Sequence, residues 1–272
     1  MHSSTIGHEA RNGEGIVRYQ VEGDPGAPPV ILINSIGSTG EMWTRQMDAF
    51  RAAFRVIRYD VRGHGTSSVP RGPYTLDQLG GDALAVLDHA GVSAAHVCGI
   101  SLGGITAQWL GLNAPGRVRG LVLANTAARI GTVESWTERI GVVHQKGMSA
   151  VADLAMERWF TPSFRERDPE TVRAFRTMVQ NCPPDGYLGC CAALRDADLR
   201  DQVSAITKPT LLIASSADTA TPVEGLEFLR ERVNMSQMVT LDSAHLSNVE
   251  CAAEFTAAVL EFLQAQGQGP KA

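Results

Sequence analysis

The residues best suited to chemistry form the pentapeptide Gly-Ile-Ser-Leu-Gly at positions 99–103. The apolar segment 94–98 before it predicts a short buried strand, and the segment 104–112 after it has the length and spacing of a helix. A G-x-S-x-G sequence at a strand-to-helix junction is typical of a nucleophile elbow, a turn too tight for side chains two residues before and two residues after the serine. A glycine-rich turn with an incidental serine is the alternative. The flanking pattern favours Ser101 as a nucleophile at the end of a sheet.

A serine nucleophile needs a histidine base, which in turn needs an acid to orient it. Behind such an elbow the acid and then the histidine follow in loops after late strands. His245 follows the last predicted strand, whereas His144 falls in a helical region. Asp218 lies in the loop after the preceding strand; the competing acid, Asp242, lies on a strand end, poorly placed to reach the imidazole. We therefore predict that Ser101 attacks an acyl carbon, His245 moves its proton and Asp218 orients His245.

Each of these residues has an ordinary alternative when taken singly. A histidine in a loop is often a surface residue, and an aspartate in a turn often only stabilises the turn. The strand that follows the elbow helix ends in Asn125, which carries no charge, so the chain offers no acid there. The required order and the required loops together favour the catalytic interpretation.

Acyl transfer also needs two N–H donors for the developing oxyanion, each worth about 3 kcal/mol of the barrier. The backbone N–H of Leu102, directly after the nucleophile, is one candidate. The other is expected in the loop after the strand at 30–33, where we predict the backbone N–H of Ile36, with Ser35 as second choice. His64 lies in a loop between two glycines, and we expect it to brace neighbouring backbone rather than to react.

The elements that must position these residues alternate between strand and helix. Runs that are apolar on both faces are typical of parallel strands covered by helices, which predicts an α/β fold. The polar ends at 1–14 and beyond 264 look like loose ends. Strands are predicted at 16–21, 30–33, 54–59, 94–98, 118–124, 210–214 and 237–241, and helices at 41–50, 75–90 (with Thr75 as N-cap), 104–112, 223–232 and 250–263.

The alternation lapses between residues 126 and 205. This stretch has the pattern of three or four short helices, with breaks at Gly147 and at several prolines, and contains no predicted strand. Inserted between two strands of a sheet, such a block is expected to form a helical lid (cap) over the strand ends. The chain would then divide into a core at 1–125 and 206–272 and a lid at 126–205. A helical subdomain with a core of its own is the alternative, and both descriptions can hold together.

The composition excludes several classes of protein. The chain has 272 residues, 44% of them hydrophobic, and a net charge of −5 without a long run of lysine or arginine. This balance argues against nucleic acid or an anionic membrane as a partner. The five cysteines lack zinc-like spacing, and neither a signal peptide nor a membrane-spanning run is visible. We expect a soluble cytoplasmic protein with reduced thiols, no metal and no cofactor. The oligomeric state is not predicted.

The chain resembles the α/β-hydrolase superfamily and, within it, the 3-oxoadipate enol-lactonases. The resemblance covers about residues 16–263 and implies a mostly parallel eight-stranded sheet flanked by helices, with a helical lid inserted after the sixth strand. The superfamily resemblance rests on residues 62–67, 99–104, 218 and 245, and the narrower one on residues 34–37, 125–131, 158–161, 186–193 and 218–222.

The resemblance implies hydrolysis of a small carboxylate-bearing enol-lactone to 3-oxoadipate, in the catabolism of aromatic compounds. The free carboxylate of such a substrate needs a cationic or N–H partner near the lid. Arg129 and Trp136 follow the strand that ends at residue 125, and we predict that both bind substrate together with Ser35. A solvated arginine and a tryptophan of the lid core are the alternatives.

Three functions remain open on the sequence alone. The first is an enol-lactonase. The second is another hydrolase that uses the same triad, such as a carboxylesterase, a homoserine-lactone hydrolase or a cofactor-free perhydrolase. The third is a small-molecule receptor that keeps the triad but turns over slowly. A fold does not decide between activities, so the choice depends on the site.

Overall fold

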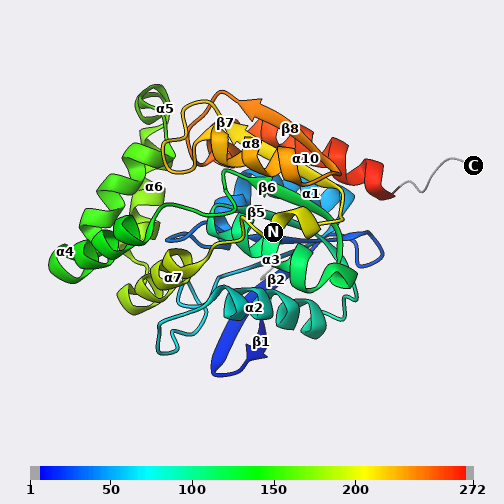
Figure 1. Ribbon diagram of the computed structural model, residues 1–272, viewed down its shortest axis with the longest axis horizontal. Coiled ribbons are helices and arrows are strands. Elements are labelled where there is room, and N and C mark those ends of the chain that lie inside the picture. Colours follow the sequence, from blue (N-terminus) through cyan, green and yellow to red (C-terminus); the bar gives the residue numbers. More distant parts are fainter. Residues whose placement is uncertain (1–6, 268–272) are drawn as a thin grey trace, which may run out of the picture.

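Eight strands form one mixed sheet in the order β1-β2-β4-β3-β5-β6-β7-β8 in the computed structural model, which describes residues 7–267 (Figure 1). β1 pairs antiparallel with β2, and β2 pairs antiparallel with β4; every later pair is parallel. The strands are β1 (His8–Asn12), β2 (Gly15–Glu22), β3 (Pro29–Ile33), β4 (Arg55–Tyr59), β5 (Ala95–Ile100), β6 (Val118–Ala124), β7 (Thr210–Ser215) and β8 (Ser236–Leu241). This is the mostly parallel sheet that the resemblance implied.

Helices cover both faces of the sheet, which explains why every residue of β5 and β7 is buried. α1 and α10 pack against each other on one face, while α2 and α3 pack together on the other, where α8 lies against β7. Thr75 caps α2 with a capping box, as predicted. The helices of this part of the chain are η1 (Gly40–Trp43), α1 (Thr44–Ala53), α2 (Leu76–His89), α3 (Leu102–Asn113), η2 (Pro115–Arg117), α8 (Val223–Arg232), α9 (Ser247–Glu250) and α10 (Ala252–Gly267).

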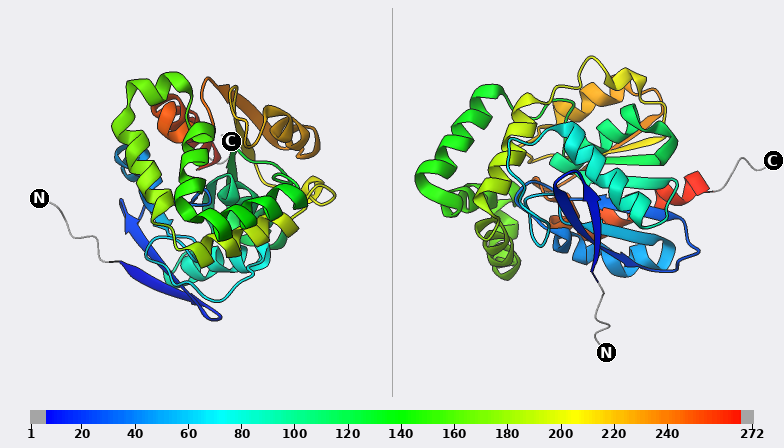
Figure 2. Two further views of the ribbon diagram at one scale, coloured as in Figure 1. Left: turned by 90° about the vertical axis from the view of Figure 1, so that its left-hand side faces the viewer. Right: turned by 90° about the horizontal axis from the view of Figure 1, so that it is seen from below.

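A block of helices is inserted between β6 and β7 and lies to one side of the sheet (Figures 1 and 2). α4 is longer than expected, but its backbone leaves helical geometry at Gly147, one of the predicted breaks. α4 packs against α6 and α7, and buried aromatic rings such as Phe160 and Phe175 give the block a core of its own. Its helices are α4 (Val133–Trp159), α5 (Pro162–Arg167), α6 (Pro169–Gln180), α7 (Pro184–Asp196) and η3 (Val203–Ala205). The domain boundaries at 125 and 206 stay predictions.

The two chain ends differ from expectation. Residues 8–12, taken for part of a loose end, form β1 and pair with β2. Only Ala10 of this strand is buried, so β1 has no hydrophobic pattern that the sequence could reveal. At the other end α10 continues through Gly267 instead of ending near residue 263. Residues 1–6 and 268–272 of the predicted loose ends lie outside the described residues.

Within residues 7–267, no helix is both long enough and apolar enough to cross a membrane. In the same residues no three histidine, cysteine, aspartate or glutamate side chains are grouped in a way that could hold a metal ion. The five cysteines of the chain are unpaired, and four of them are buried.

The register of the parallel strands brings their carboxyl ends together. Ile33 of β3 lies opposite Gly99 of β5, and Ile100 of β5 lies opposite Ala124 of β6. Ala124 in turn lies opposite Ile213 of β7. The loops that carry the predicted site residues therefore start from one edge of the sheet, which is where open α/β sheets bind ligands.

Candidate active site

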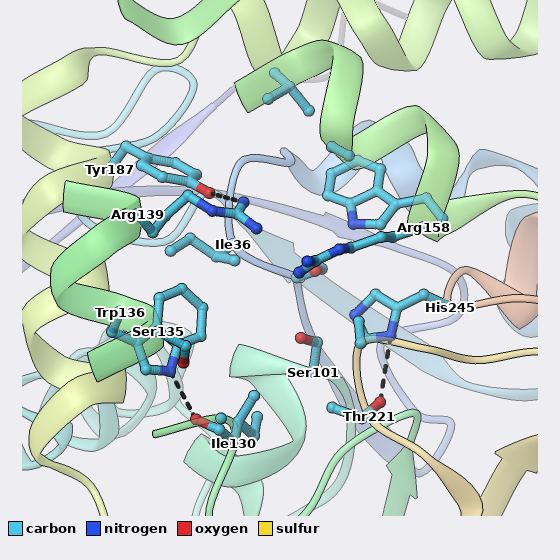
Figure 3. A pocket seen from close by; sticks show the side chains of 16 residues that line it. Ile36, Ser101, Ile130, Ser135, Trp136, Arg139, Arg158, Tyr187, Thr221 and His245 are labelled. Atoms are coloured by element: carbon cyan, nitrogen blue, oxygen red, sulfur yellow. Dashed lines mark hydrogen bonds between the residues drawn. The ribbon is translucent and has the colours of Figure 1, made fainter. Parts of the chain in front are cut away.

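A cavity of about 110 Å³ lies between the carboxyl edge of the sheet and the inserted helices (Figure 3). Ser101 and His245 line its sheet side, together with residues of the loop after β3. The helices contribute Trp136, Arg139 and other side chains of α4, and Tyr187 of α7. Residues far apart in the sequence thus line one small cavity.

Ser101 occupies a strained turn between β5 and α3. Its φ and ψ are 58° and −113°, a region that non-glycine residues rarely adopt. A side chain at Gly99 would overlap the backbone of Gly103, and one at Gly103 would overlap the carbonyl of Ile33. Glycine is therefore required at both positions, and the turn projects the serine into the cavity.

Asp218 and His245 form a buried pair beside this serine. His245 Nδ1 donates to Asp218 Oδ2 over 2.8 Å, and the hydroxyl of Thr221 donates to the same oxygen over 2.7 Å. Burial alone would raise the pKa of Asp218, but the charge of His245 and the hydrogen bonds from His245 and Thr221 outweigh it and hold the pKa below its ordinary value. Asp218 therefore stays ionised and fixes the His245 tautomer whose Nε2 is free to accept a proton. The competing acid, Asp242, instead accepts the hydroxyl of Ser216 over 3.0 Å.

Ser101 and His245 line the same cavity without a hydrogen bond between their side chains in the described chain (Figure 3). In unliganded enzymes such contacts are often long and shorten only when substrate binds. Direct proton transfer requires the two side chains to come within hydrogen-bond distance of each other.

The two backbone N–H groups predicted to form the oxyanion hole have no hydrogen-bond acceptor among the described residues. Leu102 is the first residue of α3, where backbone N–H groups have no partner within the helix. Neither its N–H nor that of Ile36 donates to any other residue among those described. The N–H of Ser35, the second choice, instead faces the sulfur of Met42 at 3.4 Å. The geometry favours Ile36 over Ser35 as the second donor.

The predicted substrate-binding residues separate into two groups. Ser35 and Trp136 line the cavity. The hydroxyl of Ser35 is buried without a hydrogen-bond partner among the described residues. The indole N–H of Trp136 donates to the carbonyl of Ile130, so Trp136 presents only its apolar ring to the cavity. Arg129 is not among the cavity residues; it pairs with Asp198 at 3.3 Å. The structure does not bring Arg129 to the site because the chain just after β6 lies against the loop that follows α7, where Asp198 pairs with it.

Two arginines that the sequence analysis missed line the cavity instead. Arg139 and Arg158 come from the two halves of α4, and Figure 3 shows both guanidinium groups turned into the cavity above Ser101. Arg139 donates to the hydroxyl of Tyr187 over 3.2 Å. Neither arginine pairs with a carboxylate anywhere in residues 7–267. The three-residue spacing between Trp136 and Arg139 places both on one helix face and could have signalled Arg139.

Comparison with known proteins agrees with this site. Residues 28–251 match the family model of the α/β hydrolase fold. The chain is 42% identical to 3-oxoadipate enol-lactonase 2 of Acinetobacter baylyi over 89% of its own length and 91% of that protein. It is 36% identical to 3-oxoadipate enol-lactonase 1 of the same organism, covering 87% and 88% of the two chains. The crystal structure of the enol-lactonase from Burkholderia xenovorans superposes with a TM-score of 0.93 at 37% identity, covering 94% of this chain and all of that one.

The chain therefore belongs to the α/β-hydrolase family. Within that family it is a hydrolase of the enol-lactonase type, as its homology over almost the full length shows.

Proposed function

We propose that the protein hydrolyses 3-oxoadipate enol-lactone, or a close analogue with a free carboxylate, to the open-chain dicarboxylate. The observation that carries this proposal is the pair Arg139 and Arg158 in the cavity, without carboxylate partners among residues 7–267. Two like charges in one small cavity repel each other, and an anionic ligand relieves that repulsion. The names of the relatives, which are enol-lactonases, support the same substrate class.

The size of the cavity supports a small substrate. Its volume of about 110 Å³ is well below that of pockets for drug-sized ligands, which is on the order of 300–1,000 Å³. A single small ring with a short acid side chain suits this space, with its carboxylate held by the planar guanidinium groups. Trp136 and Ile36 would supply the apolar walls.

The proposed reaction has two halves. Ser101 Oγ attacks the lactone carbonyl carbon while His245 Nε2 takes the hydroxyl proton, and the N–H groups of Leu102 and Ile36 stabilise the oxyanion. The intermediate then breaks its ring C–O bond, and the enolate oxygen that this frees, still attached through the carbon chain of the acyl-enzyme, receives the proton from His245. An enolate is a good leaving group, so this half needs little further assistance. In the second half His245 deprotonates water, which attacks the acyl-enzyme and releases the acid and Ser101.

The test is to follow the loss of ultraviolet absorbance of the enol-lactone, beside hydrolysis of p-nitrophenyl acetate. We expect the lactone to be strongly preferred and Ser101→Ala to abolish both activities. A strong preference for the ester would instead indicate a carboxylesterase. Absence of turnover on both, with ligand binding intact in Ser101→Ala, would indicate a receptor. The homoserine-lactone hydrolase and perhydrolase alternatives are tested with their own substrates, and the cytoplasmic location stays a prediction.

A further inference from the structure

The loop from Asn34 to Ser38, which contains the proposed oxyanion donor Ile36, is held by several hydrogen bonds. The side chain of Asn34 donates to the carbonyl of Tyr59 over 2.8 Å and accepts from the indole of Trp43 over 2.9 Å. The Ser35 carbonyl accepts from both the N–H and the hydroxyl of Ser38, at 3.2 and 2.7 Å. The N–H of Ile36 is left without an acceptor in the described chain. The hydrogen bonds of this loop therefore leave the backbone N–H of Ile36 available to a ligand.

The two peptide groups that flank Ile36 are fixed by different partners. The Ser35 carbonyl and the Ile36 N–H belong to one planar peptide, so the hydrogen bonds from Ser38 also set the direction of that N–H. The next peptide carries the N–H of Gly37, which donates to Nε2 of His64 over 2.9 Å. Gly37 has a φ of 80° at the third position of this turn, as in type II turns. Type I and type II turns differ in the orientation of that central peptide, so its partner decides which turn forms.

His64 can act as this partner in only one chemical form. Its Nδ1 lies 3.2 Å from the Arg62 carbonyl, which can only accept, and its Nε2 faces the Gly37 N–H, which can only donate. The ring must therefore be neutral, with its proton on Nδ1. His64 is 1% exposed, and burial lowers its pKa, although the Arg62 carbonyl and the charge of Asp60 act in the opposite direction. The environment of the ring thus favours the form that the loop needs.

We propose that His64 is a positioning residue for the oxyanion hole: by accepting the Gly37 N–H it fixes the central peptide of the turn, and so maintains the turn whose Ser38 hydrogen bonds orient the N–H of Ile36. The inference rests on the proposed function only in that Ile36 serves as an oxyanion donor. It does not depend on which ester or lactone is the substrate. Because the oxyanion forms only in the tetrahedral intermediate and the transition states beside it, and not in the bound substrate, His64 acts on kcat and leaves ground-state binding unchanged.

The test compares two variants of His64. His64→Leu fills the space of the imidazole but cannot accept a hydrogen bond, whereas His64→Gln keeps a neutral acceptor. If His64→Leu does not fold, His64→Ala takes its place. With p-nitrophenyl acetate we expect kcat of His64→Leu to fall about 10- to 100-fold while KM stays nearly constant. This fall is no larger than the one expected when an oxyanion-hole donor is removed altogether. We expect His64→Gln to stay within about threefold of the wild type, because it can still accept the Gly37 N–H.

A second measurement separates transition-state binding from general damage. Phenylboronic acid takes up the Ser101 oxygen on boron, with the serine proton passing to His245, and so places an oxygen in the oxyanion hole. Adipate, a dicarboxylate, forms no such adduct. In His64→Leu the inhibition constant of phenylboronic acid should rise by about the factor that kcat loses, whereas that of adipate should not change.

His96 offers a matched control. It is also buried, at 2% exposed, and burial together with Arg119 lowers its pKa to about 4, but it lies on β5 away from the cavity. His96→Leu should leave kcat unchanged. The inference fails if folded His64→Leu keeps kcat within about twofold, if the leucine and glutamine variants are equally impaired, or if phenylboronic acid binding does not follow kcat. A wild type that hydrolyses the ester but not the enol-lactone would overturn the proposed substrate and leave the role of His64 standing.

Discussion

The side-chain amide of Asn125 donates a hydrogen bond to Oδ2 of Asp218 over 3.0 Å. The same amide donates to the hydroxyl of Ser215 over 2.8 Å, and its oxygen accepts the hydroxyl of Ser247, two residues after His245. Asn125 is fully buried and has a φ of 44°, which asparagine tolerates better than most residues. The end of β6 thus supplies a neutral side chain that holds the loops of both the proposed acid and the proposed base.

Replacing Asn125 with aspartate should make activity depend on pH in a new way. When protonated, the new carboxyl group can still donate to Asp218. As it ionises, two carboxylates stand side by side in a buried space, which raises the pKa of the new group and disturbs the contact between Asp218 and His245. We expect kcat/KM of Asn125→Asp, divided by that of the wild type, to fall as the pH rises from about 5 to about 9.

The measurement is a pH–rate profile with p-nitrophenyl acetate for both proteins. Asn113→Asp is the matched control, since it makes the same chemical change at an exposed position on α3. A ratio that does not change with pH in Asn125→Asp would show that the contact with Asp218 has no catalytic consequence.

The lowered pKa of Asp218 predicts how stability depends on pH. A group whose pKa is lower in the folded than in the unfolded protein contributes stability above its unfolded pKa of about 4, and this contribution is lost as the pH falls toward the folded value. Asp218→Asn should therefore be less stable than the wild type at pH 7, and the difference should shrink below about pH 4. Urea unfolding at several pH values measures it. A difference that stays constant down to the lowest pH would contradict the role assigned to the charge.

Arg62 and Asp82 form a second buried pair, outside the cavity. Arg62 donates to both carboxylate oxygens of Asp82, at 2.5 and 2.6 Å, and the two side chains are 3% and 1% exposed. Removing one partner leaves a buried charge uncompensated, so Asp82→Ala should lower the free energy of unfolding by about 3–5 kcal/mol. Exposed Asp48, which pairs with Arg51 on the surface of α1, is the control, and Asp48→Ala should cost about 1 kcal/mol or less. Similar losses in the two variants would refute the argument.

Much of this fold was readable in the sequence because its central strands are apolar on both faces. Residues 118–124 and 210–214 match β6 and β7 to within one residue, and the glycines of the elbow identify the turn at Ser101. β1 gave no such signal, since it contributes a single buried side chain, Ala10, and owes its conformation to pairing with β2. A strand fixed mainly by backbone hydrogen bonds leaves little trace in the residue pattern.

The walls of the cavity were harder to predict than its catalytic edge. Ser101, Asp218 and His245 follow strands, and the parallel register brings strand ends together whatever the side chains are. Arg139 and Arg158 lie on one helix on either side of Gly147, where the φ of 71° changes the direction of the chain. Which face of each half turns to the cavity depends on packing against α6 and α7, so the spacing from Trp136 could signal Arg139 only because Trp136 was already placed at the cavity. Arg158, beyond Gly147, had no such neighbour. Arg129 was predicted to bind substrate because it follows β6 in the sequence, but the structure places it outside the cavity.

The two cavity arginines give the sharpest test of substrate class. A hydrogen bond to a charged group contributes about 1.5–3 kcal/mol, so Arg139→Ala or Arg158→Ala should raise KM for the enol-lactone about 10- to 100-fold. KM for p-nitrophenyl acetate, which has no carboxylate, should change less than about threefold. Arg129→Ala is the control, because Arg129 pairs with Asp198 outside the cavity, and it should leave both constants unchanged. Steady-state kinetics with both substrates measure these effects. Equal changes in KM for the lactone and the ester would mean that the arginines shape the cavity without binding the carboxylate. An increase in KM confined to Arg129→Ala would restore the assignment of Arg129 made from the sequence.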